Sequence, residues 1–253
     1  MSSTPHFMLH LEPEPARVAR WSAAEGLDRP GEDDGYVWHA LLAASFGALA
    51  PKPFRLLQRP NRPSQLLGYT SADEASLRTH VSQFAAPDVV AALGLDRLAV
   101  KHMPDAYPVG LELGFEVRVR PMVRQDRDGD RTRSRERDAF LVAIEKAGPR
   151  GERNDLVRDD VYRDWLDQRL AAGGASLVSA CVLARSRSRV SRRNRERELV
   201  AVGGSGGGAP DVVFTGMLKV SEPQAFRELL TRGIGRHRAF GFGMLLLKPG
   251  GGG

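Results

Sequence analysis

The sequence predicts an α+β fold made of two tandem units, each with the order βαββαβ. Strand-like and helix-like segments follow this order through residues 7–103, and the same order recurs through residues 111–248. Hydrophobic residues make up 42% of the 253-residue chain, which is enough for a packed core in each unit. We therefore expect two ferredoxin-like (RRM-like) domains, at residues 1–106 and 107–253.

The first unit begins with an apolar stretch that stops before two prolines, as a short strand does. Apolar residues then recur at helical spacing from Tyr36 onwards, and this helix is closed by Pro51. A turn rich in Pro and Asn joins the next two strands. The expected elements are a strand at 7–11, a loop at 24–35, a helix at 36–49, strands at 54–58 and 64–70, a helix from Ser71 and a strand at 95–103.

The second unit begins with a strand in which Phe115, Val117 and Val119 alternate with polar residues, so one of its faces is polar. A polar insertion follows. The next helix is amphipathic, with Trp165 and Leu166 on its apolar side. The expected elements are a strand at 111–123, a helix at 159–172, strands at 176–183 and 212–220, a helix at 222–232 and a strand at 240–248.

Composition and cysteine count exclude several classes of protein. No run approaches the roughly 18 apolar residues of a membrane span, and residues 1–10 lack the basic and apolar regions of a secretory signal. The single cysteine, Cys181, excludes an internal disulfide framework and a cysteine-based zinc site. Because Cys181 lies in an apolar strand, we expect it to be buried. These features predict a soluble, cytoplasmic protein.

The chain is basic, with 37 Lys and Arg against 31 Asp and Glu and a formal net charge of +6. Only five of these cations are lysine. Because GC-rich codons also produce an Arg-rich, Lys-poor chain, the net charge by itself is weak evidence for nucleic-acid binding. The positions of the arginines are more informative.

Arginine is concentrated in two segments outside the βαββαβ pattern. Residues 127–137 hold five arginines against three acids, and residues 185–198 hold seven against two. Alternate side chains of an extended strand lie about 6.6 Å apart on one face, close to the spacing of phosphates along a nucleic-acid strand. We therefore predict a basic hairpin that binds nucleic acid; the alternative is a solvated charge run. The predicted nucleic-acid-binding arginines are Arg185, Arg187, Arg189, Arg192 and Arg193, with Arg131 and Arg133 from the first segment. The alternative for the first segment is a mobile loop.

A glycine-rich segment, residues 233–243, lies between the last predicted helix and the last predicted strand. Its glycines allow close backbone approach to a phosphate, and basic neighbours add positive charge. It lacks the Gly-Lys-Ser/Thr of a Walker A loop, and a Rossmann fingerprint runs from strand to helix instead. Two interpretations remain, a phosphate-binding loop and a helix C-cap with a tight turn. The binding residues under the first are Gly233, Gly235, Arg236, His237 and Arg238.

Tyr36 and His39 are the candidates for catalysis. Three residues apart in the first turn of a helix, they share a face. A helix N-terminus disfavours the imidazolium ion, so it keeps a histidine neutral and able to accept a proton. Deprotonation of an RNA 2′-hydroxyl requires such a base. The alternative is a structural histidine, because Trp38 and Leu41 flank it.

No cluster of His, Asp and Glu in the sequence has the spacing of metal ligands. His6 and His10 are four residues apart, but on a strand they lie about 13 Å apart and cannot share a metal. We therefore predict metal-independent chemistry and no cofactor.

The segment Arg232-Gly-Ile-Gly-Arg-His-Arg-Ala-Phe-Gly-Phe-Gly-Met-Leu-Leu-Leu-Lys-Pro249 resembles the C-terminal glycine-rich loop and last strand of the CRISPR-associated repeat endoribonucleases. It is most similar to their type I-E members, the CasE subunits of Cascade. The resemblance extends in thinner form over most of the chain. Tyr36-Val-Trp-His39 stands where that family carries a catalytic tyrosine and histidine, and the second basic segment matches a hairpin that the family places along its RNA stem.

The resemblance implies a specific activity. The family cuts CRISPR precursor RNA at the 3′ base of the repeat stem-loop, by attack of a 2′-hydroxyl on the neighbouring phosphate, and leaves a 2′,3′-cyclic phosphate without using a metal. On this basis His39 moves a proton, Tyr36 orients the nucleophile, and the arginines read the stem by shape and phosphate contacts. The protein would then stay bound to the cut RNA with other Cascade subunits as partners.

Two alternatives remain open at this point. Some repeat-binding relatives have lost catalysis, so a non-cleaving RNA-binding subunit of a ribonucleoprotein complex is the main one. A metabolic enzyme or regulatory module with a phosphate-binding loop would also use the glycines, but it leaves both arginine segments unexplained.

Overall fold

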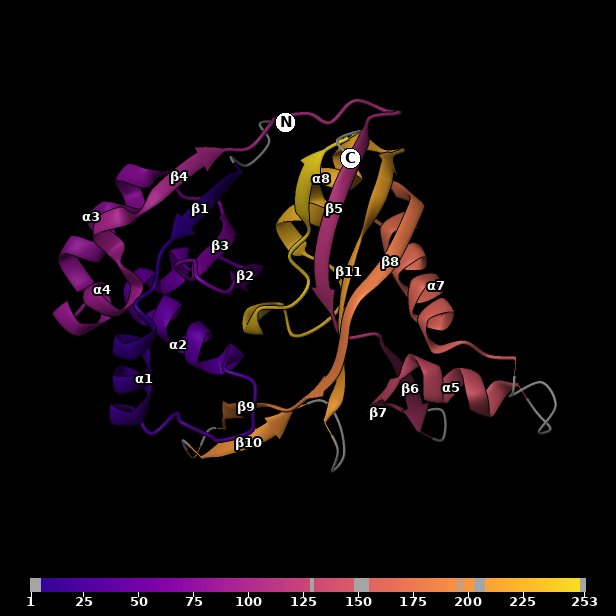
Figure 1. Ribbon diagram of the computed structural model, residues 1–253, viewed down its shortest axis with the longest axis horizontal. Coiled ribbons are helices and arrows are strands. Elements are labelled where there is room, and N and C mark those ends of the chain that lie inside the picture. The colour runs from indigo at the N-terminus through magenta and orange to yellow at the C-terminus, as the bar shows by residue number, and fades with distance from the viewer. Residues whose placement is uncertain are drawn as a thin grey trace.

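Figure 1 shows two halves side by side, with a loop near the C-terminus of the second half reaching towards the first. This computed structural model describes residues 6–127, 130–147, 155–194, 196, 198–202 and 208–250. Of residues 126–127, 130–135 and 202, the backbone alone is described.

The first half is an antiparallel four-stranded sheet with helices packed on it. Leu9 and Leu11 are fully buried on one face of the first strand, as its period of two requires. Asp73 caps a helix by accepting a hydrogen bond from the Ser76 amide at 2.8 Å. The elements are β1 (Phe7–Leu11), α1 (Pro15–Ala24), α2 (Gly35–Phe46), β2 (Phe54–Leu57), β3 (Gln65–Thr70), α3 (Glu74–Phe84), α4 (Pro87–Leu93) and β4 (Ala99–His102).

The second half repeats this plan with additions. Phe115, Val117 and Val119 are buried in one cluster with Trp165 and Leu166 of the amphipathic helix. The elements are β5 (Glu112–Val119), β6 (Met122–Arg127), β7 (Asp130–Asp138), α5 (Ala139–Lys146), α7 (Arg158–Ala171), β8 (Ala175–Ser188), β9 (Val190–Arg193), β10 (Leu199–Val202), β11 (Ala209–Val220), α8 (Pro223–Arg232) and β12 (Leu246–Pro249).

The two sheets have the same strand order. They run β2-β3-β1-β4 and β12-β5-β11-β8, so each places the first and third strands of its unit in the centre. This confirms the predicted α+β class with tandem ferredoxin-like units. A division at residues 106 and 107 stays a prediction; β4 ends at His102 and β5 begins at Glu112.

Several elements differ from the prediction in number or in extent. Helix α1 was not predicted, although Pro15 suits a first helical turn, where its missing N–H has no partner to lose. The strand expected at 111–123 is two strands, β5 and β6, because Pro121 interrupts the ladder. The polar insertion contains an antiparallel hairpin of β6 and β7 followed by α5.

The edges of the second sheet also differ from expectation. Strand β12 begins at Leu246 rather than residue 240, because residues Arg238–Phe240 form a 3₁₀ turn. Strand β8 continues to Ser188, since it pairs with β11 as far as Ala209. Cys181 is exposed, so the expectation of burial was wrong; its neighbours Ala180 and Val182 pack on the core, and Cys181 lies on the opposite face of β8.

Arg118 of β5 joins the two halves. Its guanidinium forms ion pairs with Asp33, which precedes α2, and with Asp211 of β11. These three side chains are 20%, 12% and 8% exposed. Burial works against the charge, but the two carboxylates outweigh it and raise the pKa of Arg118. The ring of Phe242 lies 4.2 Å from the guanidinium carbon. The network therefore ties α2 to the central strands of the second sheet.

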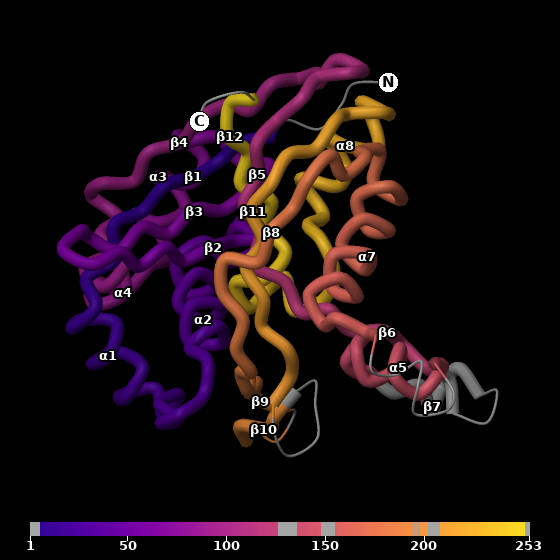
Figure 2. Tube along the Cα trace, turned by 45° about the vertical axis from the view of Figure 1, so that its right-hand side comes forward, coloured from indigo at the N-terminus to yellow at the C-terminus, as the bar shows by residue number. Residues whose placement is uncertain are grey.

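Further contacts follow the same seam. The Tyr69 hydroxyl donates to the Leu245 carbonyl at 2.9 Å, and the Asp33 amide donates to the Arg189 carbonyl at 2.7 Å. Leu199 of β10 packs against the hydrophobic cluster of the first half. The hairpin of β9 and β10, which extends beyond the second sheet in Figure 2, therefore contacts the first half.

Among the described helices, none combines the length and the apolar character needed to cross a bilayer.

We expect Arg118→Met to lower the free energy of unfolding by about 3 kcal/mol, because it leaves two buried carboxylates without their cation. Urea unfolding followed by circular dichroism measures the change. The control is Lys219→Met, which removes an exposed pair with Glu112 between the same strands, 48% and 49% exposed, and costs less than about 1 kcal/mol. Equal losses would contradict the role given to Arg118.

Candidate active site between the two halves

Helix α2 brings Tyr36 and His39 to the seam between the halves. Their ring centroids lie 5.9 Å apart. The helix begins at Gly35, and a Cβ there would lie 2.4 Å from the Phe240 carbonyl oxygen. The absence of a side chain at Gly35 therefore lets the first turn of α2 pack directly against the glycine-rich loop.

The glycines of this loop have a structural role. Gly233 ends α8 with φ 73°, and Gly243 has φ 79°, values that favour glycine. A Cβ on Gly243 would lie 2.2 Å from the Ile234 carbonyl oxygen, and the Ile234 amide donates to the Gly243 carbonyl at 2.8 Å. This closed turn fits the C-cap interpretation and holds the basic residues 236–238 at its tip. Phosphate binding by the loop stays a prediction.

Phe240 is the point where the loop meets the predicted catalytic pair. Its ring centroid lies 5.6 Å from that of His39, 6.0 Å from that of Tyr36 and 6.1 Å from that of His237. The seam thus brings together Tyr36 and His39 from one half and His237 from the other, around one aromatic ring.

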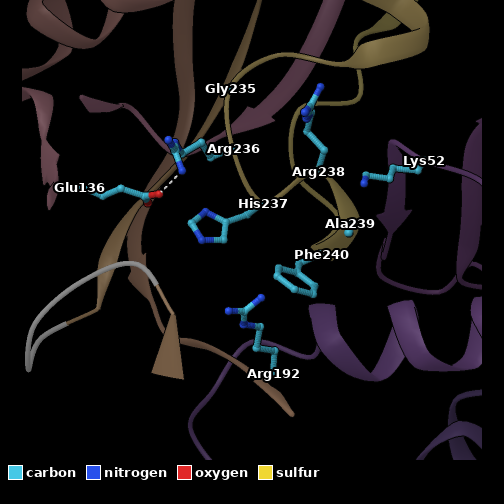
Figure 3. Close-up of a pocket in the computed structure, with 9 residues that line it drawn as sticks. All are labelled: Lys52, Glu136, Arg192, Gly235, Arg236, His237, Arg238, Ala239 and Phe240. Carbon is cyan, nitrogen blue, oxygen red and sulfur yellow. Dashed lines mark hydrogen bonds and ion pairs between the residues drawn. The ribbon is translucent and has the colours of Figure 1, made fainter. Parts of the chain in front are cut away.

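A cavity of about 700 Å³ opens beside this ring. Figure 3 shows Lys52 extending into it from the first half and His237 from the loop, with Arg192 on a further side. Its described lining carries one acid, Glu136, which pairs with Arg236. The lining residues are Lys52, Glu136, Arg192, Gly235, Arg236, His237, Arg238, Ala239 and Phe240. Such a basic, open cavity suits a phosphate-bearing ligand.

Two histidines at the seam are held neutral. Burial, and then the positive charge of Lys52, lower the pKa of His39 below its ordinary value. Burial lowers the pKa of His237 to about 4, with Arg120 as the next cause. Both imidazoles are therefore unprotonated near pH 7, and His39 has the state of a proton acceptor.

The predicted RNA-binding arginines do not all reach the cavity. Arg192 lines it from β9. Arg189 lies between β8 and β9, where its carbonyl accepts a hydrogen bond from Asp33. Arg193 turns the other way and pairs with Glu25, next to the end of α1.

Arg185 and Arg187 lie near the end of β8, and both side chains pair with acids of the second half. Arg185 pairs with Asp159, and Arg187 pairs with the buried Asp138 at 3.3 Å. These ion pairs compensate part of the positive charge of Arg185 and Arg187. Arg131 and Arg133 belong to β7, but their side chains lie outside the described part of the chain.

Sequence reasoning missed Lys52 and Phe240. Lys52 sits between Pro51 and Pro53 in the connection that follows α2, and its only signal was its place among five lysines in the chain. Phe240 lies in the glycine-rich segment, but it is not among the binding residues predicted there. Both gain their significance from contact across the seam, which no local pattern encodes.

Within the described residues, no group of three or more His, Cys, Asp or Glu side chains is placed to hold a metal ion.

Comparison with known proteins identifies one family. Its model, described as CRISPR associated protein, matches residues 7–249. No curated protein matches the sequence.

Solved structures share the fold across nearly the whole chain. Cse3 of Thermus thermophilus, bound to an RNA representing a pre-cleavage complex, is 20% identical with a TM-score of 0.61, covering 97% of this chain and 100% of that one. The CRISPR endoribonuclease Cse3 bound to 19 nt RNA is 22% identical with a TM-score of 0.61 and the same coverage, 97% and 100%. Cas6e of Escherichia coli K-12 is 16% identical with a TM-score of 0.55, covering 96% and 99%. At these identities, the likeness is one of fold.

We expect Lys52→Met to raise the pKa of His39, because it removes a positive charge that opposes imidazolium formation. NMR titration of the imidazole resonances measures this, and His237 should titrate at about 4 in the same experiment. Lys101→Met, on the exposed surface of β4, is the control. If the pKa of His39 is unchanged in the Lys52 variant, the charge of Lys52 does not act on His39 and the prediction is wrong.

Proposed function

The chain belongs to the CRISPR-associated protein family, and on this premise we propose that it is a metal-independent endoribonuclease that processes CRISPR precursor RNA. It cleaves at the base of the repeat stem-loop and leaves a 2′,3′-cyclic phosphate on the mature guide RNA. The observation that carries this proposal is the position of His39. It is a neutral base on α2, beside Lys52 and next to a basic cavity.

The proposed reaction is a transesterification within the RNA. His39 accepts the proton of the 2′-hydroxyl, the 2′-oxygen forms a bond to the adjacent phosphorus, and the bond from phosphorus to the 5′-oxygen breaks. The imidazolium then holds the proton that the departing 5′-oxygen needs. Tyr36, whose ring is 5.9 Å from that of His39, orients the nucleophile. Because the nucleophile belongs to the substrate, the step requires a base and charge stabilisation.

Lys52 and the arginines of the cavity supply the charge stabilisation. The attacked phosphate gains negative charge in the transition state, and cations fixed in a partly desolvated cavity stabilise that charge better than water does. Lys52 and Arg192 come from opposite halves of the chain, so the seam itself assembles this environment. The same Lys52 charge keeps His39 unprotonated until the hydroxyl proton arrives.

The partners follow from the same reasoning. Relatives of the same fold include a Cse3 bound to RNA in a pre-cleavage complex and a Cse3 bound to 19 nt RNA. We propose that the stem-loop lies along the arginines of β8 and β9, whose extended backbone spaces charges at intervals suited to phosphates. The product would then remain bound, with this chain a subunit of the Cascade complex.

A non-cleaving RNA-binding subunit is the second candidate function. The burial of His39 favours this candidate. His39 is half-buried with its ring against that of Phe240, and a histidine in such a position also serves a structural role. Both candidates bind the repeat RNA, so only a cleavage measurement separates them.

We expect His39→Ala to lower the cleavage rate by at least about 100-fold while repeat binding stays nearly unchanged, because His39 moves a proton and contributes little affinity. Purified protein is incubated with labelled repeat stem-loop RNA in EDTA, and the ends of the product are analysed. His80→Ala, a half-buried histidine on α3, is the control. Cleavage by the His39 variant at the parental rate would remove His39 from the mechanism. If the parent protein binds the RNA tightly but does not cleave it, the non-cleaving RNA-binding subunit is the candidate function that remains.

The pH dependence tests the neutral base separately. A general base works only when unprotonated, and His39 has a pKa lowered below the ordinary value of about 6.5. The cleavage rate should therefore stay level as the pH falls towards 6.5 and decline only below it. In Lys52→Met the decline should begin at a higher pH, and the maximal rate should also be lower. A rate that rises on acidification would be incompatible with a histidine base.

A further inference from the structure

A second basic cavity lies on the other side of the glycine-rich loop from the first. It has a volume of about 340 Å³ and is walled by α7, the end of α8, the start of β6 and the loop. Trp165 of α7 fixes one wall, since its indole N–H donates to the Met122 carbonyl at 3.0 Å. Five arginines line it: Arg124, Arg169, Arg232, Arg236 and Arg238. We call this cavity the arginine pocket.

The arginine pocket concentrates like charge. None of its described lining residues is acidic, and Glu136 pairs with Arg236 from the side of the first cavity. Arg238 donates to the carbonyl of Arg232, and burial followed by the charges of Arg232 and Arg236 lowers the pKa of Arg238. Arg169 stacks on Trp165, with its guanidinium carbon 5.2 Å from the ring centroid. Cations held this close repel one another, and a bound anion relieves that repulsion.

The arginine pocket is continuous with the proposed active site. Gly235, Arg236 and Arg238 line both cavities, so the tip of the loop is their common wall. An RNA chain whose reacting phosphate lies in the first cavity carries further phosphates on each side of it. One of the two directions leads across Arg236 and Arg238 into the arginine pocket.

We propose that the arginine pocket binds backbone phosphates of the single-stranded RNA on the 3′ side of the cleaved bond. The inference rests on the proposed function, because a cut at the 3′ base of the stem puts the stem on the 5′ side. Arg236 and Arg238 then contact the strand as it leaves the cut, while Arg169 and Arg232 hold the phosphates beyond. RNA is favoured over an acidic protein segment because the two cavities share a wall.

The test compares two RNAs that carry a 2′-deoxy nucleotide at the cut, so that binding is measured without cleavage. The shorter one, the stem-only RNA, ends with the nucleotide directly after the cut, so that both RNAs contain the scissile phosphate, and the other has a further single-stranded 3′ extension. The proteins are the parent, the double variant Arg169→Gln with Arg232→Gln, and the control Arg163→Gln, which alters another α7 arginine that pairs with Asp160. Affinity is measured against salt concentration for each combination.

For the parent, the extension should tighten binding on the order of tenfold at low salt and steepen the salt slope by about 1.4, from two added phosphate contacts on a single strand. The double variant should lose this gain while binding the stem-only RNA as the parent does, and Arg163→Gln should keep it. Because Arg169 packs on Trp165, Arg232→Glu, at the exposed end of α8, provides a second variant and should also lose the gain.

Two outcomes would overturn the inference. If the extension brings the parent no affinity, the arginine pocket does not hold this strand and an acidic protein surface becomes its occupant. If the double variant keeps the full gain, the extension binds elsewhere. Cleavage of the unmodified stem-loop is scored separately. If the parent cleaves the RNA but gains no affinity from the extension, only this inference is refuted. If it gains affinity from the extension but does not cleave, only the proposed nuclease activity is refuted.

Discussion

The guanidinium of Arg118 lies between the carboxylates of Asp33 and Asp211 with little access to water. Such a network is stable only when all its members are in place, because each unpaired charge is costly to bury. It joins the segment before α2 to the two central strands of the second sheet. Phe242 packs on the same guanidinium. This buried ion network therefore holds the start of α2 next to the glycine-rich loop, where Gly35 and Phe240 pack directly on each other.

The glycine-rich loop uses its backbone and its side chains for different purposes. Its glycines, with positive φ and close carbonyl neighbours, form a closed turn at the end of α8. That turn holds Arg236, His237 and Arg238 at its tip. Two of these residues, Arg236 and Arg238, line both of the cavities that meet at the loop. The structural turn and the proposed ligand-binding element are therefore the same segment, and the two interpretations of its glycines are compatible.

Electrostatics explains the state of the histidines at the seam. Burial alone disfavours an imidazolium ion, and the cations Lys52 and Arg120 reinforce the effect at His39 and His237. Lys52, which lines the cavity proposed to hold a phosphate, thus also favours the unprotonated form of the proposed base His39. The arginines of β8 differ, because Arg185 and Arg187 are paired with carboxylates of α7 and β7. An arginine-rich segment therefore contains residues with distinct environments that its composition does not separate.

The sequence by itself determined the repeated βαββαβ order, because strand alternation and helical spacing are local patterns that burial of one face requires. It also placed Tyr36 and His39 on one helical face, and it singled out the glycine-rich loop. Tertiary structure alone decided that Phe240 would meet His39 and that Lys52 would face the cavity. These contacts join segments far apart in the chain, and no period or spacing encodes them. The same holds for Cys181, whose exposure follows from which face of β8 packs on the core, a property of the tertiary structure.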